Sequence, residues 1–515
     1  MTGSETGSGS RLRLEALSPL VKSALVQCSL FHGSFTQEAA EHILWLDEHD
    51  PTCWALDVIE QLVKLGLVET FQPLPHHTRF TLSADAMAFA AQAKTDEPKA
   101  TILRVKSRHA AYYAHLGSER RIEALSQHGG GYHVHILMLE QANLRAGLNH
   151  ALDCQEAKSA AGLLLAYSAL VNLKGPPRLL TSFCEKVLES GTINGVLKLR
   201  VLIEYARALR ISVGVSKANA IATQAHELAK ELQNDHYEAV SLGVLGIIAI
   251  QEGNTQLSLE LSRQALAIHK AANNRMYEGI LQADMGILHT TLGDLEQARV
   301  CHEEALLIHR EVGNRRCEGV AMTNLALINT ELGEITIATE LYEEAIVLLR
   351  ETAHRRLEGC ALGNLGDLYL NQDKLREARE YLETAVEISH EVGYKVPEGA
   401  FLGSLSELSL REGNLTEART HINQAEQLMR EANDAIELAK VVCRKGWLNL
   451  AENDLDATHV ALSECKKLIK HLGVADENSL AVSIRELDEK ANAKRKLSGK
   501  TNNRFDSTEP PAQIQ

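Results

Sequence analysis

The chain has 515 residues, of which 45% are apolar and 4% aromatic, and its formal net charge is −15. An acidic chain with so few aromatic side chains argues against general nucleic-acid binding, which needs basic surfaces and stacking platforms. Its nine cysteines are scattered without a CxxC pair. They indicate small buried thiols in a reducing compartment, and neither a disulfide framework nor a zinc site.

The two ends of the chain differ in composition from the rest. The start MTGSETGSGS has no hydrophobic signal core, and no apolar run reaches the ~18 residues that a transmembrane helix needs. We therefore expect a cytoplasmic protein without a membrane partner, with residues 1–10 as a disordered leader. Residues 476–515 are expected to form a charged helix, to about residue 496, and then a disordered tail.

Residues 11–95 alternate helical and extended patterns. Helices are expected at about 20–30, 36–44 and 55–67, strands at 68–71 and 78–82, and a further helix from Ala84. Three helices followed by a two-stranded hairpin is the order of a winged helix, so a winged-helix-like domain is predicted. Residues 11–94 hold six Lys/Arg against ten Asp/Glu, and the third helix carries Asp57 and Glu60. This charge balance argues against DNA as a partner.

Residues 96–195 are expected to be a helical linker with a degenerate first repeat. A loop at 126–131, which contains three glycines, should interrupt it. His133 and His135 share one side only in an extended segment, and no third ligand is near them in sequence. His302-Glu303 resembles the start of HExxH, but Leu306 stands where the second histidine belongs. No metal site, cofactor or catalytic residue is therefore expected.

From about residue 196 to 475 the chain repeats itself every forty residues. Small residues recur in fixed columns: Gly279, Gly319, Gly359, Gly399; Gly286, Ala326, Gly366; Ala298, Ala338, Ala378, Ala418. About five repeats, over 238–437, are in strict register, with degenerate copies near 158–197, 198–237 and 438–470. A unit of this length cannot bury its apolar face alone, so the pattern predicts an α-solenoid of stacked helical hairpins.

One repeat shows why the unit is a hairpin. Apolar residues recur at helical spacing over 358–370, and a turn around Asp373 ends that helix. A second amphipathic helix follows from Leu375 and stops at Gly393, which suits a left-handed C-cap. The small residues should let neighbouring helices approach closely, so a bulky side chain at Ala338 is expected to overpack the hairpin.

The segments EGVAMTNLALINTELGEITIATELYEEAI and EGCALGNLGDLYLNQDKLREAREYLETAV resemble the tetratricopeptide repeat in its forty-residue form. The runs SALVQCSLFHGSFTQEAA, RHAAYYAHL and LEQANLRAGLNHAL look like the segment between the ATPase module and the repeats of bacterial STAND regulators, the signal-transduction ATPases with numerous domains. This second resemblance implies a winged helix, a helical linker and a repeat sensor, the C-terminal half of such a regulator. The one GK[ST] match, Gly499-Lys500-Thr501, has Lys494 in place of the first P-loop glycine, so nucleotide binding is not expected.

The resemblance to tetratricopeptide arrays implies that the first helix of each hairpin lines a concave groove. Positions five or six residues after the repeat-leading glutamate commonly meet bound peptide in that family. Here they are Asp284, Asn324 and Asn364, with Asp367 one turn further on. A side-chain amide can bind both the donor and the acceptor of a peptide backbone. The alternative is that these side chains bond within their own hairpin.

A second set of repeated residues consists of Arg315 and Arg355 at the hairpin junctions, in register with Arg275 and Lys395. It could bind an acidic partner. Each base also precedes a glutamate by three residues, so local ion pairing is the favoured alternative.

We therefore expect a mainly α protein that is a non-enzymatic scaffold or sensor in a signalling system. The repeat array would bind a peptide or a partner protein, and the winged helix and linker would relay its occupancy to another component, such as a separate ATPase. Two alternatives stay open. One is a transcriptional regulator that reads DNA through the winged helix, and the other is the sensor half of a nucleotide-driven STAND switch.

Overall fold

The computed structural model describes residues 17–46, 54–127, 129–174, 178–191, 193–212, 214–432, 434–472 and 479–505. The chain divides into a first unit, residues 1–324 with 351–353, and a second unit, residues 325–350 with 354–515. Both are almost wholly helical, and the described residues contain one two-stranded sheet. Among those residues, no helix combines the length and the apolar character needed to cross a membrane.

The N-terminal elements follow the expected order. They are α2 (Pro19–Cys28), α3 (Gln37–Ile43), α4 (Ala55–Lys64), β1 (Val68–Leu74), β2 (His77–Leu82) and α5 (Ala84–Ala93). Ser18, Thr36 and Ser83 cap α2, α3 and α5 through their side-chain oxygens, which fixes where these helices begin. The strands are antiparallel, with Val68 opposite Leu82. The expected leader, residues 1–10, lies outside the described residues.

The linker that follows is a series of helices in the first unit. They are α6 (Lys99–Ala114), the 3₁₀ turn η1 (His115–Gly117), α7 (Glu119–Ala124), α8 (Gly130–Leu139), α9 (Gln141–Asp153), α10 (Ala157–Lys174) and α11 (Arg178–Glu189). The expectation of a loop at 126–131 was wrong at its end, because Gly130 and Gly131 already belong to α8. Gly129, with φ of 77°, takes the left-handed conformation at the N-cap, so the chain turns there.

A buried ion pair joins the strands to the linker. Arg79 of β2 is fully buried, and its guanidinium lies 2.6 Å from the carboxylate of Glu140, between α8 and α9. The same guanidinium donates to the carbonyl and the hydroxyl of Ser34, and Asn143 donates to Glu140. Each member therefore has several partners, as a buried charge requires.

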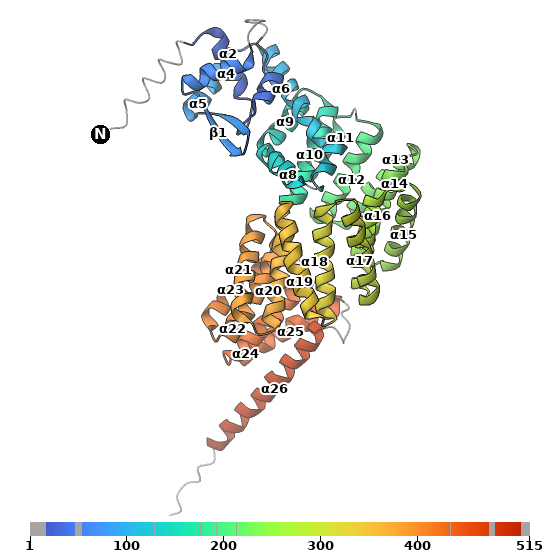
Figure 1. Cartoon of the computed structure of the whole chain (residues 1–515). Coiled ribbons are helices and arrows are strands. Elements are labelled where there is room, and N and C mark those ends of the chain that lie inside the picture. The colour runs from blue at the N-terminus through green and yellow to red at the C-terminus, as the bar shows by residue number, and fades with distance from the viewer. Residues whose placement is uncertain are drawn as a thin grey trace, which may run out of the picture. The chain divides into compact units, whose positions relative to one another are not determined.

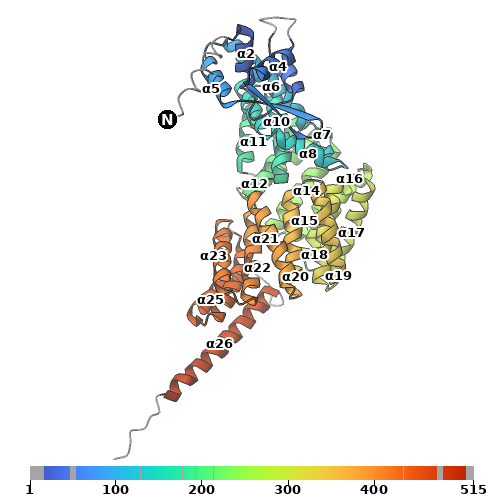
Figure 2. The same ribbon diagram turned by 60° about the vertical axis from the view of Figure 1, so that its left-hand side comes forward.

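Seven helical hairpins follow at constant spacing. Their helices are α12 (Gly195–Ser212), α13 (Val215–Glu231), α14 (Asp235–Gln251), α15 (Thr255–Ala271), α16 (Arg275–Thr291), α17 (Leu295–Glu311), α18 (Arg315–Glu331), α19 (Ile335–Glu351), α20 (Arg355–Asn371), α21 (Leu375–Glu391), α22 (Lys395–Arg411), α23 (Leu415–Ala432), α24 (Ala435–Ala451) and α25 (Leu455–Leu472). Figures 1 and 2 show the pairs α14–α17 side by side in the first unit and α20–α25 in the second. The first helices begin every 40 residues from 195 to 435. The backbone register therefore includes the hairpins at 195 and 435, whose sequences looked degenerate.

The small-residue columns lie where the two helices of a hairpin meet. All members of the alanine column at 298, 338, 378 and 418 have no exposed surface. A Cβ on Gly366 would lie 2.8 Å from Cγ of Leu382, on the second helix of the same hairpin. Any larger side chain would force such helices apart, so the expected close approach is confirmed.

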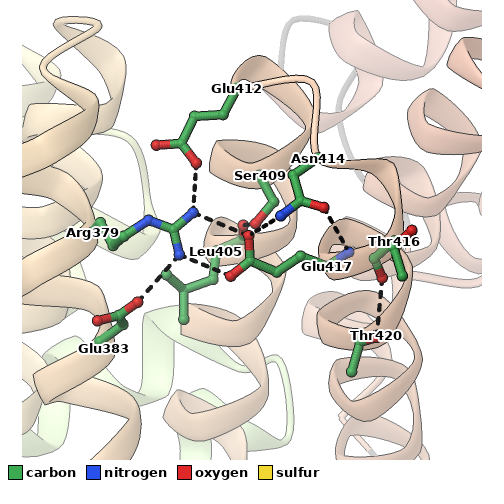
Figure 3. Close-up of polar contacts among 9 residues, drawn as sticks. All are labelled: Arg379, Glu383, Leu405, Ser409, Glu412, Asn414, Thr416, Glu417 and Thr420. Carbon is green, nitrogen blue, oxygen red and sulfur yellow. Dashed lines mark hydrogen bonds and ion pairs between the residues drawn. The ribbon is translucent and has the colours of Figure 1, made fainter.

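A charged cluster ties two consecutive hairpins together in the second unit. Arg379 of α21 donates to Glu417 of α23 at 2.9 and 3.2 Å and to Glu412 at 2.5 Å (Figure 3). Asn414 caps α23 by accepting from the backbone N–H of Glu417, and its amide donates to the Glu417 carboxylate (Figure 3). Arg419, one repeat later, pairs with Glu452, the counterpart of Glu412, and donates to the side-chain carbonyl of Asn449.

The last helix, α26 (Ser479–Phe505), packs on α24 and α25. The ammonium of Lys494 donates to the carbonyl of Leu450 in the last turn of α24, at 2.9 Å. The expected helix end at residue 496 was wrong, because the helix continues through 497–505. Gly499-Lys500-Thr501 therefore lies within a helix, in a context unlike the strand-to-helix turn of a phosphate-binding loop.

Candidate functional site

The first helices of consecutive hairpins are neighbours. In the first unit α12 contacts α14 and α14 contacts α16, and in the second unit α20 contacts α22 and α22 contacts α24. A side chain at one position of each first helix therefore lies beside its counterparts in the next repeat. The position of Asp284, Asn324 and Asn364 is occupied in other repeats by Glu204, Ser404 and Arg444.

In the first unit, Glu204 and Asp284 occupy this position, and both interact with Arg207. Arg207 lies 2.6 Å from the carboxylate of Glu204, which also accepts from Ser168 and Asn172. Burial opposes ionisation of Glu204, but Arg207 and these hydrogen bonds outweigh it, so its pKa lies below the usual range. Burial raises the pKa of Asp284 to about 6, although Arg207 and Arg210 oppose the rise.

A cavity of about 230 Å³ lies over these helices. Its walls come from α7, α10, α12, α14, α16 and the first residues of α18, all in the first unit. Apolar side chains such as Leu165, Ile203, Val240 and Ile280 form much of the lining, and Glu204 and Arg207 belong to it. An apolar hollow with a few convergent polar groups is the usual form of a ligand site.

Helix α7 forms one rim of this cavity. Glu119 of α7 accepts a hydrogen bond of 2.7 Å from the Tyr237 hydroxyl, and Arg200 donates to the carbonyl of Gly117 at 3.0 Å. Burial raises the pKa of Tyr237 well above its usual range, and the bond to Glu119 raises it further, so the phenol remains a donor at neutral pH. Burial and the neighbouring Glu119 raise the pKa of Glu123, while Arg200 opposes the rise.

In the second unit the corresponding face is a polar network. Glu407 lies 2.6 Å from Arg411 and 3.3 Å from Arg444. Burial raises the pKa of Asp367, against the opposing effects of Arg444 and a hydrogen bond from Ser404. Asp367 is therefore a half-buried carboxyl among groups that partly compensate its charge.

Asn324 and Asn364 are half-buried at the expected position of α18 and α20. Burial raises the pKa of the Tyr342 phenol on α19, and hydrogen bonds with Thr330 and Asn364 oppose that rise. Asn364 thus contacts Tyr342, a side chain of the preceding hairpin. This contact resembles the alternative, in which these side chains bond to other residues of the array and not to a peptide. A role of either asparagine in binding peptide stays a prediction.

Arg315 and Arg355 take part in local ion pairs. Arg355 donates to Glu358 at 3.0 Å and to Glu391 at 3.2 Å, and Arg315 donates to Glu318 at 2.9 Å. The carboxylates of Glu318 and Glu358 are buried, so each arginine compensates a charge at a hairpin junction. These contacts agree with the alternative that Arg315 and Arg355 form local ion pairs. Contact of the two arginines with a partner stays a prediction.

The histidines that suggested metal ligands have other surroundings. His302 is buried against Gly286, and burial lowers its pKa to about 4. Nδ1 of His135 lies 2.7 Å from the carbonyl of Gly131, within α8. Across the part of the chain that the structure describes, no three His, Cys, Asp or Glu side chains come together as a possible metal site.

The sequence analysis missed Glu204, Arg207, Tyr237 and Glu119. Glu204 stands two repeats before Asp284, and Arg207 stands four repeats before Asp367, so the forty-residue register extended toward the N-terminus would have found both. Glu119 lies outside the repeats, and no periodicity connects it to Tyr237.

Comparison with known proteins agrees with this architecture. Residues 244–483 match the family model of the MalT-like TPR region. No curated protein sequence matches the chain. A Rap protein complexed with competence and sporulation factor has 14% identity and a TM-score of 0.52, over 71% of this chain and 99% of that one.

Two further solved structures have lower TM-scores. A STAND protein with a tetratricopeptide repeat sensor, from Pyrococcus horikoshii, has 14% identity and a TM-score of 0.43 over 85% of this chain. The chain spans 66% of that protein's length. The APC/C hetero-tetramer Cut9–Hcn1 has 14% identity and a TM-score of 0.48, over 85% of this chain and 80% of that one.

Proposed function

Because the chain is a tetratricopeptide-repeat protein, we propose that it is a non-enzymatic sensor that binds a peptide segment on the inner face of its array. The observation that carries the proposal is the cavity of about 230 Å³, to which the first helices of consecutive hairpins each contribute side chains. A surface assembled from one helix per repeat is suited to an extended ligand, which can meet successive helices along its length.

The likeness to the Rap protein supports the proposal. That structure, which holds competence and sporulation factor, shares the repeat fold with this chain. At 14% identity the likeness concerns the fold, and the chemistry of the ligand has to come from the side chains of this chain.

The N-terminal helices, strands and linker would pass the occupancy of the array to a second component, such as a separate ATPase in the cytoplasm. The buried pair of Arg79 and Glu140 fits such a relay, because it fixes the strands to the linker helices within the first unit. The elements 19–93 would act as a winged-helix-like domain that binds protein. DNA is a poor ligand for this domain, because Asp57 and Glu60 both lie on the exposed face of α4.

The test is a selection of random twelve-residue peptides against the full chain, with affinities of the selected peptides measured by calorimetry. We expect Asn324→Ala, on the first-unit part of the inner face, to weaken binding about tenfold or more, since its amide would bond the peptide backbone. The matched control is Asn219→Ala on the second helix α13 of the same unit, which should bind as the wild type does. Failure to enrich any peptide would contradict the proposal.

A further inference from the structure

Two cysteines face each other in the hairpin of α24 and α25. A Cβ placed on Gly446 of α24 would lie 3.5 Å from Cβ of Ala461 on α25, so the two helices approach closely at this level. Cys443 lies one turn before Gly446, and Cys465 lies one turn after Ala461. Because the helices of a hairpin run in opposite directions, the two steps lead to the same level of the contact.

The contacts of the two sulfur atoms agree with this register. Sγ of Cys465 lies 3.6 Å from the carbonyl oxygen of Ala439, which is one turn before Cys443 on α24. Sγ of Cys443 lies 3.5 Å from Oγ of Ser483 on α26. Both cysteines belong to one buried cluster to which α24, α25 and α26 contribute.

The packing of the repeat does not require a thiol at either position. The position of Cys465 is alanine in the six preceding hairpins: Ala225, Ala265, Ala305, Ala345, Ala385 and Ala425. The position of Cys443 is a small residue in five of them: Gly243, Ala283, Thr323, Gly363 and Gly403. Two thiols at facing positions thus distinguish this hairpin from the others.

The two thiols differ in reactivity. Hydrogen bonding with the Cys465 thiol lowers the pKa of Cys443, although burial opposes the change. The same bond, together with burial, raises the pKa of Cys465. Cys443 has 3% of its surface accessible and Cys465 has none. The thiolate is the nucleophile, so Cys443 is the sulfur that a small oxidant meets first.

From this arrangement we infer that Cys443 and Cys465 are a redox pair, which a peroxide oxidises to a disulfide that joins α24 to α25. This inference is independent of the peptide-binding function proposed above. In a reducing compartment the pair stays in the thiol form, and disulfides that do form there are transient and report the level of oxidant.

The reaction has two steps. The Cys443 thiolate attacks one oxygen of hydrogen peroxide, the O–O bond breaks, and hydroxide leaves, so that Cys443 becomes a sulfenic acid. The Cys465 thiol then attacks the Cys443 sulfur, the S–S bond forms, the S–O bond breaks, and water leaves with the thiol proton. In sum the two thiols give up two electrons and two protons, and one hydrogen peroxide becomes two water molecules. A dithiol reverses the bond by exchange.

The experiment treats the full chain with hydrogen peroxide, blocks the remaining thiols with a maleimide and maps the tryptic peptides by mass spectrometry. We expect residues 441–444 joined to residues 446–466, with a mass two hydrogen atoms below the sum of the two peptides, and their release by dithiothreitol. The Cys443 thiol should be lost about tenfold or more faster than those of Cys28 and Cys184, since both are fully buried and burial raises their pKa values.

Two variants assign the roles of the sulfur atoms. Cys465→Ala and Cys443→Ala both introduce a residue that other hairpins have at the same position, so both should keep the helical circular-dichroism signal. In Cys465→Ala the reaction should stop at the Cys443 sulfenic acid, which dimedone traps. In Cys443→Ala the Cys465 thiol should survive the same treatment.

Hydrogen exchange shows whether the bond forms in the native hairpin. Amides of residues 435–472 should exchange more slowly in the oxidised wild type than in the reduced one, and peroxide should have no such effect on Cys465→Ala. The inference is overturned if both thiols survive while other cysteines react. It is also overturned if the joined peptides appear only after unfolding in urea, or if oxidation makes the hairpin exchange faster.

Discussion

A Cβ placed on Gly286 of α16 would lie 2.5 Å from Nε2 of His302 on α17. The imidazole fills the space that a side chain at 286 would need, and His302 itself is buried. The two helices of this hairpin can approach closely only because one position has no side chain. Gly366 and Leu382 repeat the relationship in the second unit.

Gly286→Ala should therefore destabilise the first unit by about 1–3 kcal/mol, because the added methyl group overpacks a close-packed contact. The measurement is urea unfolding followed by circular dichroism. Gly286→Ala combined with His302→Ala should recover part of the loss, because the smaller partner makes room for the methyl group. Strictly additive effects of the two substitutions would show that they do not contact each other.

Ala338→Leu should destabilise the second unit by a similar amount, about 1–3 kcal/mol. Ala338 on α19 has no exposed surface and stands in the column that also contains Ala298 and Ala378. The measurement is the thermal unfolding midpoint, with Ala220→Leu on the exposed face of α13 as the matched control. An unchanged midpoint for Ala338→Leu would mean that the column does not mark the helix contact.

Glu140→Gln should be strongly destabilising, by about 3–5 kcal/mol, since it leaves the buried Arg79 guanidinium without its counter-ion. Replacing both partners, Arg79→Met with Glu140→Gln, removes the uncompensated charge and should restore much of the loss. Urea unfolding of the three proteins checks this. A double variant as unstable as the single one would indicate that shape, and not charge, determines the effect.

The repeats were predictable from the sequence because their geometry is local. The column with Ala298 and Ala338 marks a buried position of the second helix. Turn residues with positive φ, such as Gly293 and Asp373, mark where the first helix ends. The hairpin at 195 keeps Ala206 and Ala218 in two of the small-residue columns. Lys198 and Leu199 stand where other repeats have Glu-Gly, so its sequence looked degenerate although its backbone is in register.

The candidate site was predictable only in part. The register identified the inner-face position of Asp284, whose carboxyl the structure places near Arg207. The contact of Tyr237 with Glu119 joins residues 118 positions apart, one inside and one outside the repeats. The pairing of Arg79 with Glu140 is likewise a product of tertiary packing, and no spacing rule connects the two residues.

The stability of the first unit should depend on the ionisation of Asp284. The pKa of this carboxyl is about 6 in the folded chain, against 3.8 as its ordinary value. Between these two pH values the unfolded chain has released a proton that the folded chain still holds. The contribution of Asp284 therefore makes stability fall as the pH rises through this window, and the loss stays constant above about pH 6.

Asp284→Asn cannot ionise, so this variant should be more stable than the wild type by about 3 kcal/mol at neutral pH. The difference should shrink toward zero near pH 4. Urea unfolding of both proteins across this range provides the measurement. A difference independent of pH would show that the amide changes stability by another route.

The cluster around Arg379 predicts a salt-dependent junction between hairpins (Figure 3). Arg379 contacts three carboxylates, those of Glu383, Glu412 and Glu417, and its own side chain is 25% exposed. Arg379→Met keeps most of the side-chain volume but leaves the three carboxylates facing one another. It should cost about 1 kcal/mol of stability at low salt, since these groups are partly solvated.

Added salt should reduce that cost, because it screens the repulsion among the remaining carboxylates. The control is Arg379→Met combined with Glu417→Gln, in which one of the opposing charges is also removed and the salt effect should be smaller. Urea unfolding of the three proteins at low and high sodium chloride measures both quantities. A cost for Arg379→Met that does not change with salt would mean that the arginine stabilises the junction through its aliphatic contacts and not through its charge.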